Sequence, residues 1–140
     1  MEHCIVYFSS SVDSFQEEDL LTILQQSRQN NLKHGITGVM LYVRGSILQV
    51  LEGEKEAVET LYKRIKQDKR HKEVIMVLNR PITQRLFPTW SMAYETITVQ
   101  QLDDIKSIID LDKKEESAAT AEDHIILRTI KLFYESNRHN

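Results

Sequence analysis

Two β-forming runs around Arg44 and Gly45 constrain the fold of this chain more than any other feature. Residues 36–43 and 46–51 are rich in Val, Ile, Leu and Tyr, and only the two turn residues separate them. Two such runs joined by a two-residue connection that contains Gly are typical of a β-hairpin. The sequence therefore predicts that the second and third strands pair with each other.

Helical periodicity appears on both sides of this hairpin. The first helical segment carries its apolar residues at helical spacing, at Leu20, Leu21, Ile23 and Leu24. It closes in the Asn-rich stretch 30–35, which ends in Gly. A second helix is predicted over residues 55–67, where one face carries Val58, Leu61, Tyr62 and Ile65. Three more strands are predicted over residues 4–9, 74–78 and 90–97.

The elements follow the order strand, helix, strand, strand, helix, strand, with a fifth strand appended. This order predicts an α+β ferredoxin-like sandwich with both helices on one face of the sheet. Beyond residue 97 the pattern predicts helices near residues 102–109 and 125–133, with a charged joint at 112–117. We expect a core domain over residues 1–97 and a C-terminal helical extension over residues 98–140. The extension would cover the other face of the sheet or pair with another subunit.

Composition argues against several classes of function. The 140-residue chain has a formal net charge of -3, without the basic stripe that binding to a nucleic-acid backbone requires. We therefore expect no direct nucleic-acid partner. No run is long and apolar enough for a membrane span, and the N-terminus does not resemble a signal peptide, so a cytoplasmic protein is expected. Cys4 is the only cysteine, which gives neither a disulfide nor a metal-ligand cluster.

A glutamine occupies an unusual position in the third predicted strand. Gln49 lies in an alternating run where Val or Ile would be usual at an inward position, and a buried primary amide needs several hydrogen-bond partners. Tyr7 in the first strand and Asn31 at the end of the first helix are candidates for the same interior. Taken singly, each is more often a satisfied core polar group or a helix cap.

Several separated blocks of this sequence resemble one family, the BLUF photoreceptors, whose name denotes blue-light sensing using FAD. They lie in family order between Cys4 and Tyr94: Ile5-Val6-Tyr7, Asn30-Asn31 with Ile36-Thr37-Gly38, Leu48-Gln49-Val50-Leu51-Glu52-Gly53, Asp68-Lys69-Arg70-His71, and Arg85-Leu86-Phe87 with Trp90-Ser91-Met92. Any single block would be a weak signal. Their joint occurrence in order makes the resemblance specific.

The resemblance implies that FAD binds without a covalent link, with its ring between the two helices. FMN or riboflavin can take the same site in a heterologous host. Ile23 and Ile65 would lie against the ring faces, and Asn31 would pair with the polar edge of the ring. Plain core packing and a helix stop are the alternative interpretations of these residues. The residues placed to reach ring oxygens, ribityl hydroxyls or phosphates are Ser27, Asn30, Arg64, Asp68, Arg70 and His71, of which the last two also suit a solvated helix end.

The resemblance also implies the photochemistry. Tyr7 would release an electron and a proton toward the excited flavin, and Gln49 would relay them and end rearranged by rotation or tautomerisation. The changed hydrogen bond would shift the flavin absorption to the red. Trp90 and Met92 match the signal-transmitting pair of the family, and alternation along the fifth strand puts both on one face. An ordinary core aromatic is the alternative for Trp90.

Two other classes of function compete with this interpretation. Tyr7, Asp68 and His71 would serve as acid-base groups in a small enzyme, but no nucleophile-base motif or metal-ligand constellation is evident. The fold alone also permits a non-photochemical module that binds flavin or another small ligand. The sequence favours a photoreceptor that is not an enzyme, forms a homo-oligomer and signals to a downstream protein.

Overall fold

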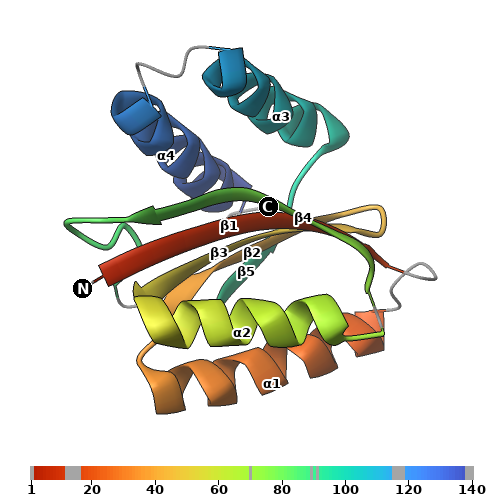
Figure 1. The fold of residues 1–140 in the computed structure, drawn as a ribbon. Coiled ribbons are helices and arrows are strands. Elements are labelled where there is room, and N and C mark those ends of the chain that lie inside the picture. Colours follow the sequence, from red (N-terminus) through yellow and green to blue (C-terminus); the bar gives the residue numbers. More distant parts are fainter. Residues whose placement is uncertain are drawn as a thin grey trace.

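The computed structural model is a five-stranded sheet between two pairs of helices (Figure 1). It describes residues 2–11, 17–69, 71–88, 90, 92–114 and 119–137. The strands are β1 (Glu2–Ser11), β2 (Thr37–Val43), β3 (Ser46–Glu54), β4 (His71–Pro81) and β5 (Ala93–Thr96). The helices are α1 (Glu17–His34), α2 (Lys55–Gln67), α3 (Val99–Lys114) and α4 (Ala119–Asn137).

The strand order in the sheet is β4-β1-β3-β2-β5. Strand β1 pairs antiparallel with β3 and β4, β2 pairs antiparallel with β3, and β5 runs parallel to β2 at the edge. This arrangement confirms the predicted α+β ferredoxin-like fold with a fifth strand appended. Tyr7 of β1 and Gln49 of β3 stand directly opposite each other in the interior of the sheet.

Residues with positive φ end two elements where the sequence predicts. Helix α1 ends at His34, and Gly35 follows with φ 65°. The N–H of Ile36 donates to the carbonyl of Asn31 at 2.9 Å, the long bond of a Schellman-type helix end. Arg44 and Gly45 have φ values of 44° and 80°, the left-handed pair that a two-residue hairpin turn needs.

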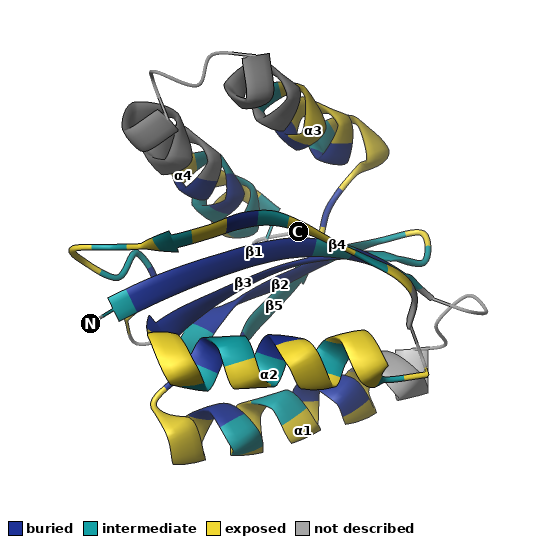
Figure 2. Ribbon diagram, in the orientation of Figure 1, coloured by how far each residue is buried: buried dark blue, intermediate teal, exposed yellow. Residues whose placement is uncertain are grey.

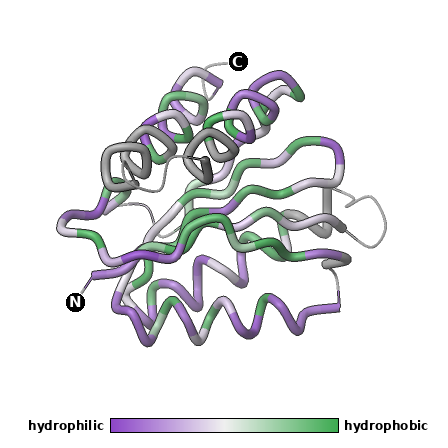
Figure 3. The backbone as a smooth tube through the Cα atoms, turned by 45° about the horizontal axis from the view of Figure 1, so that its top comes forward, coloured by the Kyte–Doolittle hydropathy of each residue, from purple (hydrophilic) through white to green (hydrophobic). Residues whose placement is uncertain are grey.

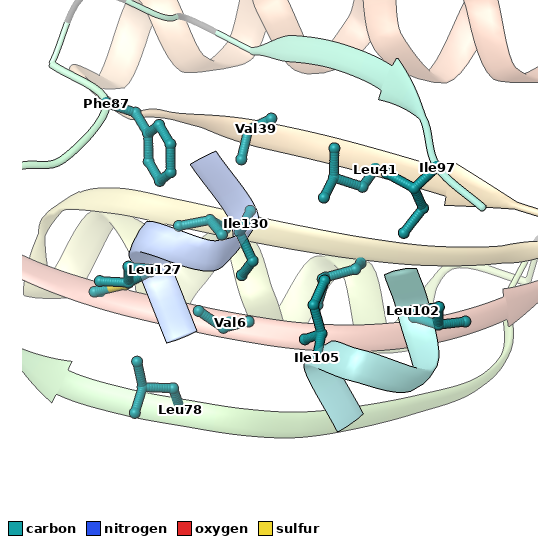
Figure 4. Close-up of a cluster of buried hydrophobic side chains, with 13 residues drawn as sticks. Val6, Val39, Leu41, Leu78, Phe87, Ile97, Leu102, Ile105, Leu127 and Ile130 are labelled. Atoms are coloured by element: carbon teal, nitrogen blue, oxygen red, sulfur yellow. The ribbon is translucent and has the colours of Figure 1, made fainter. Parts of the chain in front are cut away.

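Buried apolar side chains form a cluster on each face of the sheet (Figure 2). Hydrophobic stretches follow the strands, whereas the helices mix hydrophilic and hydrophobic residues (Figure 3). The cavity side, covered by α1 and α2, buries Ile5, Tyr7, Ile23, Met40 and Val58 among others. The tail side, covered by α3 and α4, buries Val6, Val39, Leu41, Leu102, Ile105, Leu127 and Ile130 among others (Figure 4). The C-terminal helices therefore cover the second face of the sheet.

The predicted fifth strand is wrong at its start. Strand β5 begins at Ala93, so Trp90 and Met92 precede it and do not alternate within it. Trp90 packs on the tail side and Met92 is buried on the cavity side, so the two residues lie on opposite faces of the sheet. The reason is an irregular connection, in which the N–H of Gly38 donates to the Trp90 carbonyl at 2.8 Å.

Three smaller predictions from the sequence also differ from the structure. Strand β4 extends well beyond the predicted residues 74–78, and His71 begins this strand and is not part of a helix end. Arg70 and the side chain of His71 lie outside the described residues. The predicted charged joint at residues 112–117 falls partly in α3, which ends at Lys114, and its remainder lies outside the described residues.

Candidate functional site

A cavity of about 250 Å³ lies between α1, α2 and the sheet. Its walls are mostly apolar, and polar groups converge from the sheet and both helices. The sheet contributes Tyr7, Met40, Ile47 and Gln49. Helix α1 contributes Ile23, Gln26, Ser27 and Asn30, while α2 and the residue after it contribute Leu61, Arg64, Ile65 and Asp68. Apolar walls with a few converging polar groups are typical of a cofactor site.

The structure brings eight of the predicted site residues to this cavity: Tyr7, Ile23, Ser27, Asn30, Gln49, Arg64, Ile65 and Asp68. Asn31 is fully buried near the end of α1 but does not line the cavity. Four lining residues were missed by the sequence analysis, namely Gln26, Met40, Ile47 and Leu61. Period-2 alternation gives Ile47 from Gln49, and helical spacing gives Leu61 from Ile65 and Gln26 from Ile23.

Three buried side chains form a polar chain at the base of the cavity. The Tyr7 hydroxyl donates a hydrogen bond to Gln49 Oε1. The other end of the same amide, Gln49 Nε2, donates to Met92 Sδ at 3.3 Å. Each of the three residues is at most 3% exposed. The orientation of the Gln49 amide is thus set by a donor on one side and a pure acceptor on the other.

The environment keeps the Tyr7 phenol protonated. Burial raises the pKa of Tyr7 far above its ordinary value, and the nearby Tyr62 and Asp68 raise it further. The Tyr62 ring meets the Tyr7 ring edge-on, with centroids 5.6 Å apart. Burial also raises the pKa of Tyr62. The raised pKa keeps Tyr7 a neutral phenol, which can donate its hydrogen bond to Gln49.

The irregular connection before β5 is held from both sides. The Arg28 Nε of α1 donates to the Met92 carbonyl at 3.0 Å on the cavity side. On the tail side, the Trp90 ring packs against Phe87 at 5.2 Å and against Tyr134 of α4 at 4.7 Å between centroids. The sequence gives no signal for Arg28 or Tyr134, because their contacts depend on the path of this irregular segment beside β2.

The residues of this cavity fit a flavin. A flavin ring is flat and apolar on both faces, and its edge carries carbonyl acceptors and an imide donor. Ile23 and Ile65 supply apolar walls on opposite helices, and Gln49 supplies an amide at the base. The Asn31 side chain adds a buried Oδ1 that accepts no hydrogen bond within the described part of the chain, although Asn31 has other contacts.

The sole cysteine lies away from the cavity. Cys4 is a free thiol buried in the tail-side cluster, on the opposite face of the sheet. A covalent link from a cysteine to a group in the cavity is therefore ruled out by position. Among the described residues, no group of His, Cys, Asp and Glu side chains is arranged to hold a metal ion. None of the described helices is long and apolar enough to span a membrane.

Comparison with known proteins gives a family match over most of the chain. Residues 3–93 match the BLUF family, described as "Sensors of blue-light using FAD". Over 93 residues the chain is 37% identical to "Photoactivated adenylate cyclase subunit beta" of Euglena gracilis, which covers 66% of this chain and 11% of that protein. The cyclase activity in that name belongs to a much longer protein, of which this chain spans about a tenth.

Solved structures give matches of two kinds. The structure described as "BlrB - a BLUF protein, dark state structure" has a TM-score of 0.68 and 31% identity, and the match covers 90% of this chain and 94% of that chain. "Klebsiella pneumoniae BlrP1 with FMN and cyclic diGMP, no metal ions" has a TM-score of 0.65 and 28% identity, over 76% of this chain and 30% of that chain. The BlrB match spans both chains almost fully, whereas the matches to the cyclase subunit and to BlrP1 cover minor parts of those proteins.

The family description names FAD, and the BlrP1 structure holds FMN, so the flavin of this family is FAD or FMN. The family match covers residues 3–93 of the 140, and it includes the Tyr7–Gln49 hydrogen bond at the base of the cavity. This chain therefore belongs to the BLUF family and is a blue-light sensor that binds a flavin.

Proposed function

We propose that light sensing in this chain uses Tyr7 and Gln49 as the reacting pair beside a non-covalently bound FAD. The observation that carries the proposal is the buried hydrogen bond from the Tyr7 hydroxyl to Gln49 Oε1 at the base of the cavity. When bound, the flavin absorbs blue light and becomes a strong oxidant. Tyr7 is suited to respond, because a phenol can release an electron and a proton together while its raised pKa prevents loss of the proton alone.

The proposed flavin contacts follow from the cavity walls. Ile23 of α1 and Ile65 of α2 would hold the two faces of the ring, and Gln49 would meet its polar edge. The sequence resemblance adds Asn31 at that edge, although Asn31 is buried and does not line the cavity in this structure. Hydroxyl, amide and charged groups at the cavity rim would hold the remainder of FAD. These rim residues are Ser27, Asn30, Arg64 and Asp68, and the sequence resemblance adds Arg70 and His71.

Rearrangement of Gln49 has a defined consequence for Met92. If the amide turns by half a turn, Nε2 faces the Tyr7 oxygen, which is able to accept a hydrogen bond. Oε1 then faces Met92 Sδ, which carries no proton to donate, so the present 3.3 Å contact is lost. A signalling state reached by this rotation therefore removes one restraint on the segment that contains Trp90 and Met92.

We propose that the output is a change in protein contacts made by the tail, residues 98–140, with residues 1–97 as the light-sensing domain. The Trp90–Tyr134 ring contact supports this, because it joins the segment next to Gln49 to helix α4. A second copy of this chain and a downstream protein in the cytoplasm are the proposed partners. Coupling requires that the dark and lit states differ in their interaction free energy with the tail.

Three single substitutions test the Tyr7–Gln49 pair. Tyr7→Phe removes the phenolic hydroxyl while keeping the ring, and Gln49→Leu removes the amide at similar volume. Both variants should fold and bind flavin, and neither should show the reversible red shift. Tyr62→Phe is the matched control, since it removes a hydroxyl from the ring that packs 5.6 Å from Tyr7 and should keep the shift. An undiminished red shift in Tyr7→Phe or Gln49→Leu would show that the assignment is wrong.

A further inference from the structure

Glu52 places a carboxylate inside the tail-side core. It lies three residues after Gln49 on β3, so alternation points it to the face opposite the cavity, and it is 0% exposed. Its two oxygens accept separate backbone hydrogen bonds from the connection between β4 and β5. The N–H of Leu86 donates to Oε2 and the N–H of Phe87 donates to Oε1, both at 2.8 Å.

Burying a carboxylate at this position costs desolvation free energy. Burial raises the pKa of Glu52, and the two backbone hydrogen bonds and the Arg85 guanidinium oppose that shift without cancelling it. An apolar side chain of similar volume would fill the same space without the desolvation cost. An apolar side chain could not accept hydrogen bonds from the N–H groups of Leu86 and Phe87, and both groups would lose their acceptor. The geometry therefore points to anchoring of the connection as the reason for the charge.

The anchored connection leads directly to the light-responsive segment. The Phe87 ring packs on Trp90, and the Trp90 carbonyl is held by the N–H of Gly38 on β2. Two residues later along the same sheet edge, the side chain of Met92 lies on the cavity side and meets Gln49. Strand β3 thus contacts this segment at two points. Glu52 binds it on the tail side, and Gln49 binds it on the cavity side.

We infer that Glu52 is a positioning residue for the light response. It fixes the start of the connection through Leu86 and Phe87, so that Trp90 is seated against α4 while Met92 reaches Gln49. Glu52 touches neither Tyr7 nor Gln49, and it acts through the connection alone. The inference rests on the proposed function, because the proposed role is to set the relative stability of the dark and lit arrangements of this segment.

An ion pair between Arg85 and Glu2 also holds this connection, and it provides a matched control variant. Arg85 donates to both oxygens of Glu2 at 3.1 and 3.0 Å and to Thr37 Oγ1 at 3.3 Å. Glu2 is 39% exposed at its side chain, so solvent screens this ion pair, whereas Glu52 is 0% exposed. Glu2→Gln changes charge near the connection but leaves both hydrogen bonds of Glu52 in place.

The experiment compares Glu52→Gln with Glu2→Gln in the flavin-loaded protein. Glutamine keeps the shape of Glu52 but has one acceptor oxygen, so one N–H of the connection loses its acceptor. We expect Glu52→Gln to keep a reversible red shift, to change the dark-recovery rate by about fivefold or more, and to shift the emission of Trp90. Because Trp90 is the only tryptophan, its emission reports on this segment directly. Glu2→Gln should stay within about twofold of the unmodified protein in recovery rate.

Recovery and Trp90 emission in Glu52→Gln that match the unmodified protein would overturn the inference. Absence of a red shift in the unmodified protein would instead overturn the proposed function, so the two failures are distinguishable. If Glu52→Gln does not fold, hydrogen exchange of the unmodified dark protein decides. Amides of Leu86 and Phe87 that exchange about 100-fold slower than those of the exposed Thr83 and Gln84 support the anchor. Equal exchange rates contradict it.

Discussion

Strand β3 carries an amide and a carboxylate that face opposite sides of the sheet. Gln49 meets the Tyr7 hydroxyl on the cavity side, and Glu52 meets two backbone N–H groups on the tail side. Buried polar groups in a sheet are costly unless each hydrogen-bonding atom has a partner. Both residues have such partners, and in the proposed function the partners of Gln49 change while those of Glu52 hold the connection in place.

The roles of Tyr7 and Gln49 beside a flavin were implied by the family resemblance. The sequence itself was sufficient to predict that these two residues enter the interior, and both are buried. It was not sufficient for Met40. This is an ordinary core residue by type, and only the pairing of β2 with β3 places it opposite Gln49. The sequence analysis quoted Glu52 only as part of a family block, because its partners are backbone groups in a connection that lacks regular structure.

The raised pKa of Tyr7 predicts a specific alkaline instability. The ordinary tyrosine pKa is about 10 in the unfolded chain, and the pKa of Tyr7 in the folded protein lies above it. The folded state therefore holds this proton more tightly. The resulting stabilisation is complete below pH of about 10 and falls by up to about 1.4 kcal/mol per pH unit above it.

Thermal unfolding between pH 8 and pH 11 checks this prediction. The melting temperature of the unmodified protein should fall more steeply above pH of about 10 than that of Tyr7→Phe, which has no proton to lose at this position. Tyr62 is present in both proteins, so its own ionisation contributes to the pH dependence of both melting temperatures. Parallel curves for the two proteins would mean that Tyr7 titrates normally.

The connection between β4 and β5 is the element that local patterns predicted least well. The hairpin and α2 follow from short-range signals, and α2 begins and ends where its apolar face predicts. The segment before β5 has β-forming residues and was therefore predicted as strand. Contacts that are distant in sequence, to Gly38, Arg28 and Glu52, decide its actual path.

The contact of Trp90 with Tyr134 is expected to couple this connection to α4. Ring pairs at 4.7 Å contribute about 0.5–1.5 kcal/mol beyond their buried area. A double-mutant cycle with Trp90→Leu and Tyr134→Leu should therefore give a coupling energy of about 1 kcal/mol in thermal or denaturant unfolding. The same pair should be non-additive in the dark-recovery rate.

The exposed Leu132 on α4 provides the control cycle. It is 58% exposed, so Trp90→Leu and Leu132→Ala should be additive within about 0.5 kcal/mol. Additivity in the Trp90–Tyr134 cycle as well, for both stability and recovery, would remove the ring contact from the proposed output route.

The two faces of the central sheet differ in what covers them and in the function proposed for them. One face carries the cavity proposed for the flavin, and α3 and α4 close the other, so these helices are part of the folded core (Figure 2). The apolar positions beyond residue 97 were sufficient to predict two helices and a buried face. They were not sufficient to choose between the sheet and another subunit as the surface they cover, because both would bury the same residues.

Core packing of the tail predicts how a change in α4 affects the molecule. Ile130 is fully buried against the sheet, and Ile130→Ala should destabilise the fold by about 2–5 kcal/mol through lost burial and a cavity. By linkage it should also change dark recovery, while the size of the red shift stays the same. Leu132→Ala on the exposed side should alter stability by at most about 0.5 kcal/mol. A normal recovery rate in a clearly destabilised Ile130→Ala would argue against coupling between tail and flavin.

An absorption spectrum of the purified protein in darkness, after blue light and after return to darkness tests the central claim most directly. The account predicts a yellow protein whose oxidised-flavin bands move to longer wavelength under blue light and return in darkness. In the proposed function the Tyr7–Gln49 hydrogen bond changes, while the flavin would remain oxidised and non-covalently bound. Bound flavin with a spectrum that does not move, or that bleaches as a covalent adduct would, would contradict the account.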